Sequence, residues 1–145
     1  MQTFLTDMDF QKSAQALDRR RLFAQIYEGI HILASLVGCN DKLVTPKRSV
    51  KKHPISLKWT GHEVVLYKYV RAHFNTWAER DAKMDPFDSI NWENLKRILV
   101  HMNDTYLPAE WVTRAHMPDW MNEETFREYK KILHEKDPVY YEKWN

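Results

Sequence analysis

Residues 9–37 read DFQKSAQALDRRRLFAQIYEGIHILASLV. The apolar side chains that recur in this segment at spacings of three and four are Leu22, Ile26, Ile30, Leu33 and Val37. Such spacing returns to one face of an α-helix. The segment from Asp9 to Val37 is therefore predicted to be helical, with one face in a core.

A second line of side chains on this predicted helix is polar. Arg21, Gln25 and Glu28 are four and three residues apart, so they share nearly the same angle around the helix axis. This line lies away from the apolar face. The sequence thus predicts an arginine and a carboxylate on one stripe, an arrangement that by itself is typical of a surface ion pair.

The remaining sequence also favours helices. Residues 38–54 carry turn-forming and basic residues with little periodicity, which predicts a long loop. Residues 60–63 read TGHE and match the S/T-x-x-E capping box, so a helix is expected to start there. Later apolar stripes predict helices after Ser89 and after Asn122, the second ending before Pro138. The fold class expected is an all-α, compact helical bundle with long connecting loops.

Composition limits the kind of molecule. With 145 residues, of which 43% are hydrophobic, the chain fits a single domain over residues 1–145. No apolar run is long enough for a membrane span, and no secretory signal is recognisable. The single cysteine, Cys39, excludes an internal disulfide and a CxxC pair. We therefore expect an intracellular, cytoplasmic protein without a membrane partner, acting as a monomer.

Basic residues are concentrated in the first half of the chain. Residues 1–62 hold 10 Lys and Arg against 5 Asp and Glu, whereas residues 63–145 hold 12 against 15. The basic residues cluster at 19–21 and again at 47–58. This pattern fits a surface that follows the phosphates of a nucleic acid, and equally a solvated basic face.

The seven histidines do not favour a metal site. None of them forms an H-E-x-x-H or comparable pattern with carboxylates. No metal and no cofactor are expected.

Four segments of the chain resemble the pyrimidine dimer DNA glycosylase family, of the endonuclease V type. They are residues 1–5 (MQTFL) with 17–22 (LDRRRL) and Glu28, the residues His53-Pro54, Lys58-Trp59 and Gly61, residues 61–67 (GHEVVLY), and the tail 140–144 (YYEKW). These segments occur in the family's order in a chain of suitable length. The resemblance implies an all-α endonuclease V-like fold.

The resemblance also implies a reaction. Members flip a nucleotide out of damaged duplex DNA and attack the sugar with the N-terminal α-amine. They then expel the base and cleave the strand from a Schiff base, without a metal. An α-amino group suits this role because its pKa of about 8 leaves some of it unprotonated at neutral pH. The implied catalytic residues are Met1, as the amine, and Glu28, as the carboxylate that stabilises charge and moves protons.

This sequence departs from the family at its start. Gln2 is too bulky for the preceding methionine to be removed, so Met1 is expected to persist at the nucleophile position. Where the founding member of the family, a phage enzyme, has a histidine and two arginines around the site, this chain has Arg21, Tyr27 and His31. A bulkier first residue would crowd the sugar pocket, which leaves the lesion open.

The partner expected is damaged or modified double-stranded DNA. The residues predicted to contact it are Arg20, Arg21, His31, Lys51, Lys52, His53, Lys58, His62, Tyr140, Tyr141 and Trp144. His53 could equally make a structural hydrogen bond, and the aromatic tail could equally dock on the protein's own helices. Two alternatives to a pyrimidine dimer enzyme are a non-catalytic module that binds distorted or modified DNA and a glycosylase for a hypermodified base.

Overall fold

The computed structural model describes residues 2–39, 44, 48–81, 88–107 and 117–144. Its helices are α1 (Phe10–Gln15), α2 (Arg19–Val37), α3 (Arg48–Lys51), α4 (Pro54–Lys58), α5 (Glu63–Arg80), α6 (Asp88–Tyr106), α8 (Glu123–Lys136) and the 3₁₀ helix η1 (Glu142–Trp144). Within these residues the chain forms helices and no strands, so the predicted all-α class is confirmed. No helix among them is long and apolar enough to span a bilayer.

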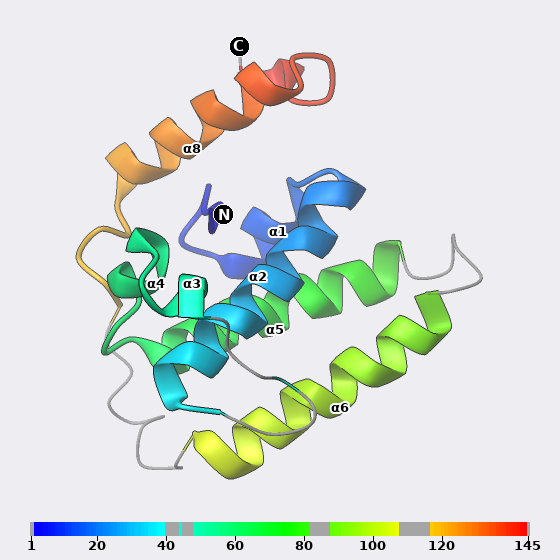
Figure 1. Cartoon of the computed structure of the whole chain (residues 1–145). Helices are drawn as coiled ribbons and strands as arrows, with labels where there is room; N and C mark the ends of the chain where they lie inside the picture. The colour runs from blue at the N-terminus through cyan, green and yellow to red at the C-terminus, as the bar shows by residue number, and fades with distance from the viewer. Residues whose placement is uncertain (1, 40–43, 45–47, 82–87, 108–116, 145) are drawn as a thin grey trace.

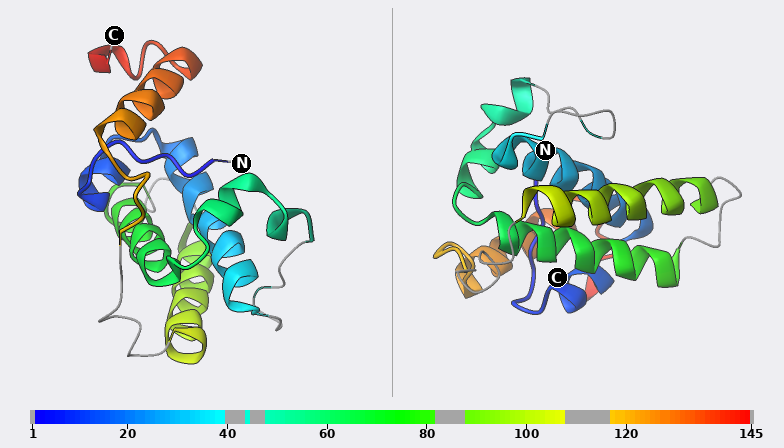
Figure 2. Two further views of the ribbon diagram at one scale, coloured as in Figure 1. Left: turned by 90° about the vertical axis from the view of Figure 1, so that its left-hand side faces the viewer. Right: turned by 90° about the horizontal axis from the view of Figure 1, so that it is seen from below.

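Helices α2 and α5 form the centre of the bundle. They pack on each other more extensively than any other pair, and α1 lies against α5 (Figure 1). The predicted apolar stripe of α2 is buried through Leu22, Ile26, Ile30 and Leu33. Helix α6 flanks this centre on one side and α8 lies on the other, an arrangement that the second view also shows (Figure 2). The apolar faces predicted from the sequence therefore meet in one core.

The continuous helix predicted from Asp9 to Val37 is wrong in one respect, because the structure breaks it into α1 and α2. Asp18 ends the break, with extended backbone and a carboxylate that accepts a hydrogen bond from the Arg21 N–H at 3.4 Å. A capping aspartate competes with helix continuation by bonding the first turn of a new helix. Helix α2 ends at Gly38, whose φ of 73° is the left-handed conformation that glycine adopts readily.

The start of α5 also differs from the prediction. The N-cap is His62 rather than Thr60, and its side chain makes no capping hydrogen bond. Glu63 instead turns back, and its Oε1 accepts from the Gly61 N–H at 3.1 Å. The predicted loop over residues 38–54 contains the short helix α3, while residues 40–43 and 45–47 lie outside the described part.

Gly29 allows the close approach of α2 to α5. A Cβ atom at this position would overlap Cγ2 of Val70, a buried and stiff β-branched side chain. We predict that Gly29→Ala lowers the free energy of unfolding by about 1–2 kcal/mol, because overpacking outweighs the gain in helix propensity. Urea unfolding measures the change. In the double variant Gly29→Ala, Val70→Ala, the loss should be smaller than the sum of the two single losses, and strict additivity would contradict the overlap.

Candidate active site

The first described residues run as an extended segment between α8 and α2 (Figure 1). A buried polar network fixes this segment to α2 and α5. The Phe4 N–H donates to Gln25 Oε1 at 3.0 Å, and the Tyr69 hydroxyl shares its proton between Gln25 Oε1 at 2.7 Å and the Phe4 carbonyl oxygen at 2.8 Å. All three residues are at least nine-tenths buried. Buried hydrogen bonds of this kind fix the path of a segment because breaking them leaves desolvated polar groups.

Two further contacts hold the segment from the other side. The indole N–H of the fully buried Trp59 donates to the Thr3 hydroxyl at 3.1 Å. The Phe4 ring meets the Tyr129 ring of α8 edge-on, with centroids 5.8 Å apart. The N-terminal segment is thus held between α4 and α8, which sets the direction of the residues before it.

Glu28 lies beside the start of the chain. The backbone N–H of Gln2 donates to its Oε2 at 3.3 Å, across 26 residues of sequence. Burial raises the pKa of the Glu28 carboxyl above its ordinary value, although this hydrogen bond acts in the opposite direction. A carboxyl with a raised pKa exchanges protons more readily near neutral pH than an ordinary glutamate.

An open cavity of about 300 Å³ surrounds this carboxylate. Its lining residues are Gln2, Phe4, Arg21, Ala24, Gln25, Glu28 and Lys136. The predicted polar stripe of α2 therefore forms one wall, the N-terminal segment a second and the end of α8 a third. The cavity combines one carboxylate with two cationic side chains.

Arg21 is held in this wall by Asp18. Its Nη1 donates to Asp18 Oδ1 at 3.2 Å, and the pair is partly buried. Burial alone would raise the pKa of Asp18, but hydrogen bonds from Tyr141 and Arg21 outweigh it and lower the pKa. The arginine is therefore paired on one side while it faces the cavity on the other.

The pyrimidine dimer DNA glycosylase family model matches residues 1–89. This chain belongs to that family. No curated protein and no solved structure matches it. The family match contains α1 to α5, the N-terminal segment and Glu28, whereas most of α6 and all of α8 and η1 lie beyond it.

The site residues expected of a family member fall into several groups in the structure. Met1 lies outside the described residues. Glu28 and Arg21 line the same cavity, and His53 lies close enough to interact electrostatically with Glu28. His31 follows Glu28 by one turn of α2 and is half-buried.

The other basic residues that the sequence predicts to contact DNA lie on the surface of this glycosylase family member. Arg20 is exposed in the first turn of α2, Lys51 and Lys52 are exposed around the end of α3, and Lys58 is exposed at the end of α4. Lys58 Nζ lies 5.1 Å from the centre of the Trp120 ring. None of these four lines the Glu28 cavity.

Two histidines cap helices. His53 is the N-cap of α4, and its Nδ1 accepts from the Ile55 N–H at 3.1 Å. This is the structural hydrogen bond that the sequence left as an alternative. His62 is the half-buried N-cap of α5.

The aromatic tail docks on the protein's own helices. Tyr141 is fully buried and its hydroxyl bonds Asp18, which leaves it no surface for stacking on a base. The prediction of a DNA contact is therefore corrected for this residue. Tyr140 is exposed but donates its hydroxyl to the Leu17 carbonyl at 3.1 Å, and the half-buried Trp144 stacks on Tyr141 with centroids 5.2 Å apart. The buried ring of Tyr141 and the contacts of its two aromatic neighbours hold this terminus against the rest of the protein.

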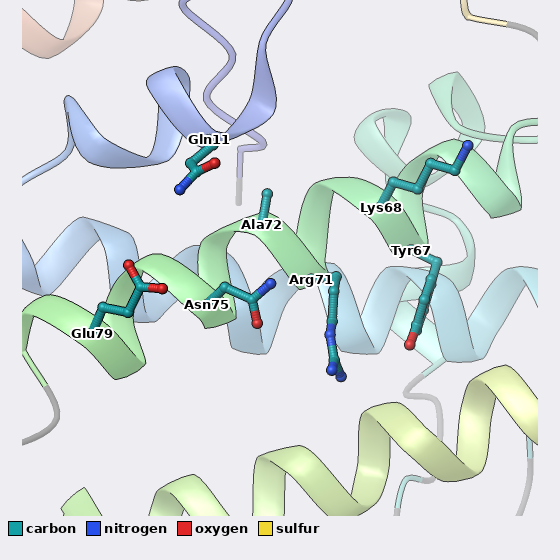
Figure 3. A pocket seen from close by; sticks show the side chains of 7 residues that line it. All are labelled: Gln11, Tyr67, Lys68, Arg71, Ala72, Asn75 and Glu79. Carbon is teal, nitrogen blue, oxygen red and sulfur yellow. The ribbon is translucent and has the colours of Figure 1, made fainter.

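A separate hollow of about 290 Å³ lies on α5 near α1 (Figure 3). Tyr67 and Arg71 point from α5 toward α6, and Gln11 approaches Ala72 from α1. No residue that the sequence predicted as catalytic or DNA-binding lines it. The hollow therefore belongs to a different surface from the Glu28 cavity.

Sequence reasoning missed three of the cavity's polar residues. Gln25 stood on the predicted polar stripe, and its spacing from Glu28 was the available signal. For Gln2, the sequence indicates only that its side chain is bulky. Lys136 lies 108 residues after Glu28, in the last turn of α8, and nothing in its local sequence distinguishes it from other lysines on that helix.

Proposed function

We propose that this member of the pyrimidine dimer DNA glycosylase family is a glycosylase with abasic-site lyase activity. It acts on a damaged or modified pyrimidine in duplex DNA. The α-amine of Met1 is the nucleophile, and Glu28 is the general acid/base and the stabiliser of the sugar cation. The observation that carries this proposal is the hydrogen bond from the Gln2 N–H to Glu28 at the edge of the cavity.

Chain connectivity supports the role of the amine. Three covalent bonds join the Gln2 nitrogen to the α-amine nitrogen of Met1, a reach of under about 4 Å in any conformation. The Gln2 nitrogen is itself 3.3 Å from Glu28 Oε2. A nucleophile and its base need such proximity, because each proton transfer requires hydrogen-bond distance directly or through one water.

The proposed chemistry proceeds in two stages. The unprotonated amine attacks the anomeric carbon, the glycosidic C–N bond breaks, and the base leaves with its electron pair and takes up a proton. The amine nitrogen gives its proton to Glu28. The C1′–O4′ bond then breaks to give the Schiff base, and the O4′ oxygen takes that proton from Glu28. A proton is next removed from C2′ and the C3′–O bond breaks, so that the 3′ phosphate leaves with the electron pair and the strand is cleaved by β-elimination. The raised pKa of Glu28 fits a group that both accepts and returns protons.

The exposed cations support duplex DNA as the substrate. The exposed side chains of Arg20 on α2, Lys51 and Lys52 around the end of α3, and Lys58 at the end of α4 present positive charge. Phosphate contacts of this kind position a protein on a duplex without reading sequence. We propose DNA contacts also for His31, His53 and His62, and for the exposed Tyr140 and the half-buried Trp144 at the tail.

Borohydride trapping tests the proposal. Wild-type protein is incubated with abasic duplex, and with duplex carrying a single pyrimidine dimer, in the presence of borohydride, which reduces the Schiff base to a stable amine. We expect a covalent protein–DNA adduct, and the mass of the attached DNA should be found on the N-terminal peptide. Protein acetylated at the α-amine is the matched control, and it should bind both duplexes without forming an adduct.

The outcomes separate the candidate functions. An adduct with abasic duplex alone would support the lyase step and point to another lesion, such as a hypermodified base. Absence of any adduct while DNA binding is intact would overturn the nucleophile assignment and leave a module that binds distorted DNA.

A further inference from the structure

Lys136 brings α8 to the cavity that contains Glu28. It is an exposed residue in the last turn of α8 and lines that cavity together with the polar stripe of α2. Together with Arg21 it gives the cavity two cationic side chains from elements that lie far apart in sequence. The residue lies beyond the part of the chain that the family model covers.

A hydrogen-bonded latch ties the chain just after Lys136 to the start of α2. The Tyr141 hydroxyl donates to Asp18 Oδ1 and accepts from the Asp18 N–H at 3.0 Å. The Tyr141 ring is fully buried and stacks on Trp144, whose ring also carries Lys130 Nζ at 5.9 Å from its centre. One hydroxyl therefore satisfies both a backbone donor and a carboxylate of the same residue.

Both ends of this latch connect to the cavity wall. On the α2 side, Asp18 Oδ1 also accepts from Arg21 Nη1 at 3.2 Å. On the α8 side, the Tyr141 N–H donates at 3.1 Å to the carbonyl oxygen of Asp137, the residue that follows Lys136. Tyr141 is therefore hydrogen-bonded to Asp18, which pairs with Arg21. It is also hydrogen-bonded to Asp137, which follows Lys136 in the sequence.

We infer that Lys136 binds a phosphodiester group of the nucleotide that occupies the Glu28 cavity, and that Tyr141 is the positioning residue that holds Lys136 and Arg21 on opposite sides of it. The inference rests on the proposed function for the identity of the ligand. A phosphodiester is the ligand that fits, because DNA carries one beside every sugar and because the cavity already places a carboxylate where the sugar would react.

This arrangement has an electrostatic reason. Glu28 raises the cost of bringing another anion into the cavity, since like charges at close range repel each other. Arg21 offsets this cost only in part, because Asp18 already neutralises one side of its guanidinium. Lys136, supplied by a different helix, adds the second positive charge that an incoming phosphate needs.

The test is a binding cycle that does not depend on catalysis. Wild type, Lys136→Met, Tyr141→Phe and the double variant are titrated with a duplex that carries a tetrahydrofuran abasic analogue, which cannot form a Schiff base. We expect each single variant to raise Kd by about three- to fivefold, the effect of one exposed ion pair. The double variant should bind no more weakly than the weaker single variant, because both changes remove the same contact.

The salt dependence of Kd provides the second readout. Loss of one phosphate contact should reduce the slope of log K against log salt by about 0.9 in both single variants. A merely structural role of Tyr141 would leave this slope unchanged. Tyr67→Phe is the matched control, since it removes a tyrosine hydroxyl from the separate hollow on α5 without touching Asp18 or the Glu28 cavity.

The failure of this inference can be distinguished from the failure of the proposed function. An unchanged slope and Kd in Lys136→Met, a surface change that does not threaten folding, would overturn the inference even if the wild type forms a borohydride adduct. An additive double variant would show that Tyr141 does not act through Lys136. If the wild type forms no adduct while the cycle gives the expected coupling, the proposed chemistry fails and the phosphate contact stands.

Discussion

Glu28→Gln is expected to lower the turnover of abasic duplex by about 100- to 10,000-fold, while its Kd for the tetrahydrofuran duplex changes by less than about threefold. Glutamine keeps the shape of the side chain and an oxygen that can accept from the Gln2 N–H, which now lies at 3.3 Å from the carboxylate. It removes the negative charge and the capacity to carry a proton. Single-turnover strand cleavage measures the effect separately from product release.

Glu63→Gln is the matched control for this prediction. Glu63 also accepts a hydrogen bond from a backbone N–H, that of Gly61 at 3.1 Å, but it belongs to the first turn of α5 and does not line the cavity. The turnover of Glu63→Gln should stay within about twofold of the wild-type value. Retention of more than a tenth of the activity in Glu28→Gln would contradict the assignment of Glu28.

The pH profile provides a further check on Glu28. Burial raises the pKa of its carboxyl above 4.5, so as the pH falls the carboxylate is lost earlier than that of an ordinary glutamate. If the carboxylate form is needed, the acid side of the profile should have its midpoint above 4.5. That limb should be absent from the residual activity of Glu28→Gln.

The second large effect concerns acid stability and His73. This side chain is fully buried in α5, where its Nδ1–H donates to the Tyr69 carbonyl at 2.7 Å. Burial lowers its pKa from 6.5 to about 4, even though that hydrogen bond acts in the opposite direction. Its Nε2 is buried and meets no hydrogen-bond partner within the described part of the chain, so a second proton would be unsolvated.

The lowered pKa sets the pH window of the effect. Above pH 6.5 His73 is neutral in both the folded and the unfolded states and adds no pH dependence. Between 6.5 and about 4 the unfolded state takes up a proton that the folded state refuses, so stability falls as the pH falls. The loss reaches about 3 kcal/mol once both states are protonated.

His73→Leu should remove this loss. Leucine has a similar volume and takes up no proton. The free energy of unfolding of the variant should therefore change less between pH 6.5 and 4 than that of the wild type. This holds whatever the difference in stability between the two proteins at neutral pH. Urea unfolding at several pH values measures it. Asp18, whose pKa is lowered, contributes in a different window, because its stabilisation is lost only below its ordinary value of 3.8. An equal fall in stability in His73→Leu and wild type between 6.5 and 4 would contradict the assignment.

The helical fold and one wall of the cavity were predictable from local patterns. The stripe of Leu22, Ile26 and Ile30 predicted the buried face of α2, and the spacing of Arg21 and Glu28 predicted that they lie on one line. Both predictions depend on the 3.6-residue period of the α-helix, which can be recognised within the sequence of a single segment. Helix ends were less accurate: Asn122 caps α8 as predicted, but Asp18 split the first helix and His62 replaced Thr60 at the start of α5.

The sequence by itself determined which residues form helices, which faces of them are buried and which stripe of α2 carries the carboxylate, because these properties depend on neighbours within about two turns. Only the tertiary structure decided that Gln2 meets Glu28, that Lys136 closes the cavity and that Tyr141 is buried on Asp18. Each of these contacts joins segments at least 26 residues apart, and the last joins segments 123 residues apart. Such contacts depend on how the buried faces of all the helices fit together, which no local spacing in the sequence encodes.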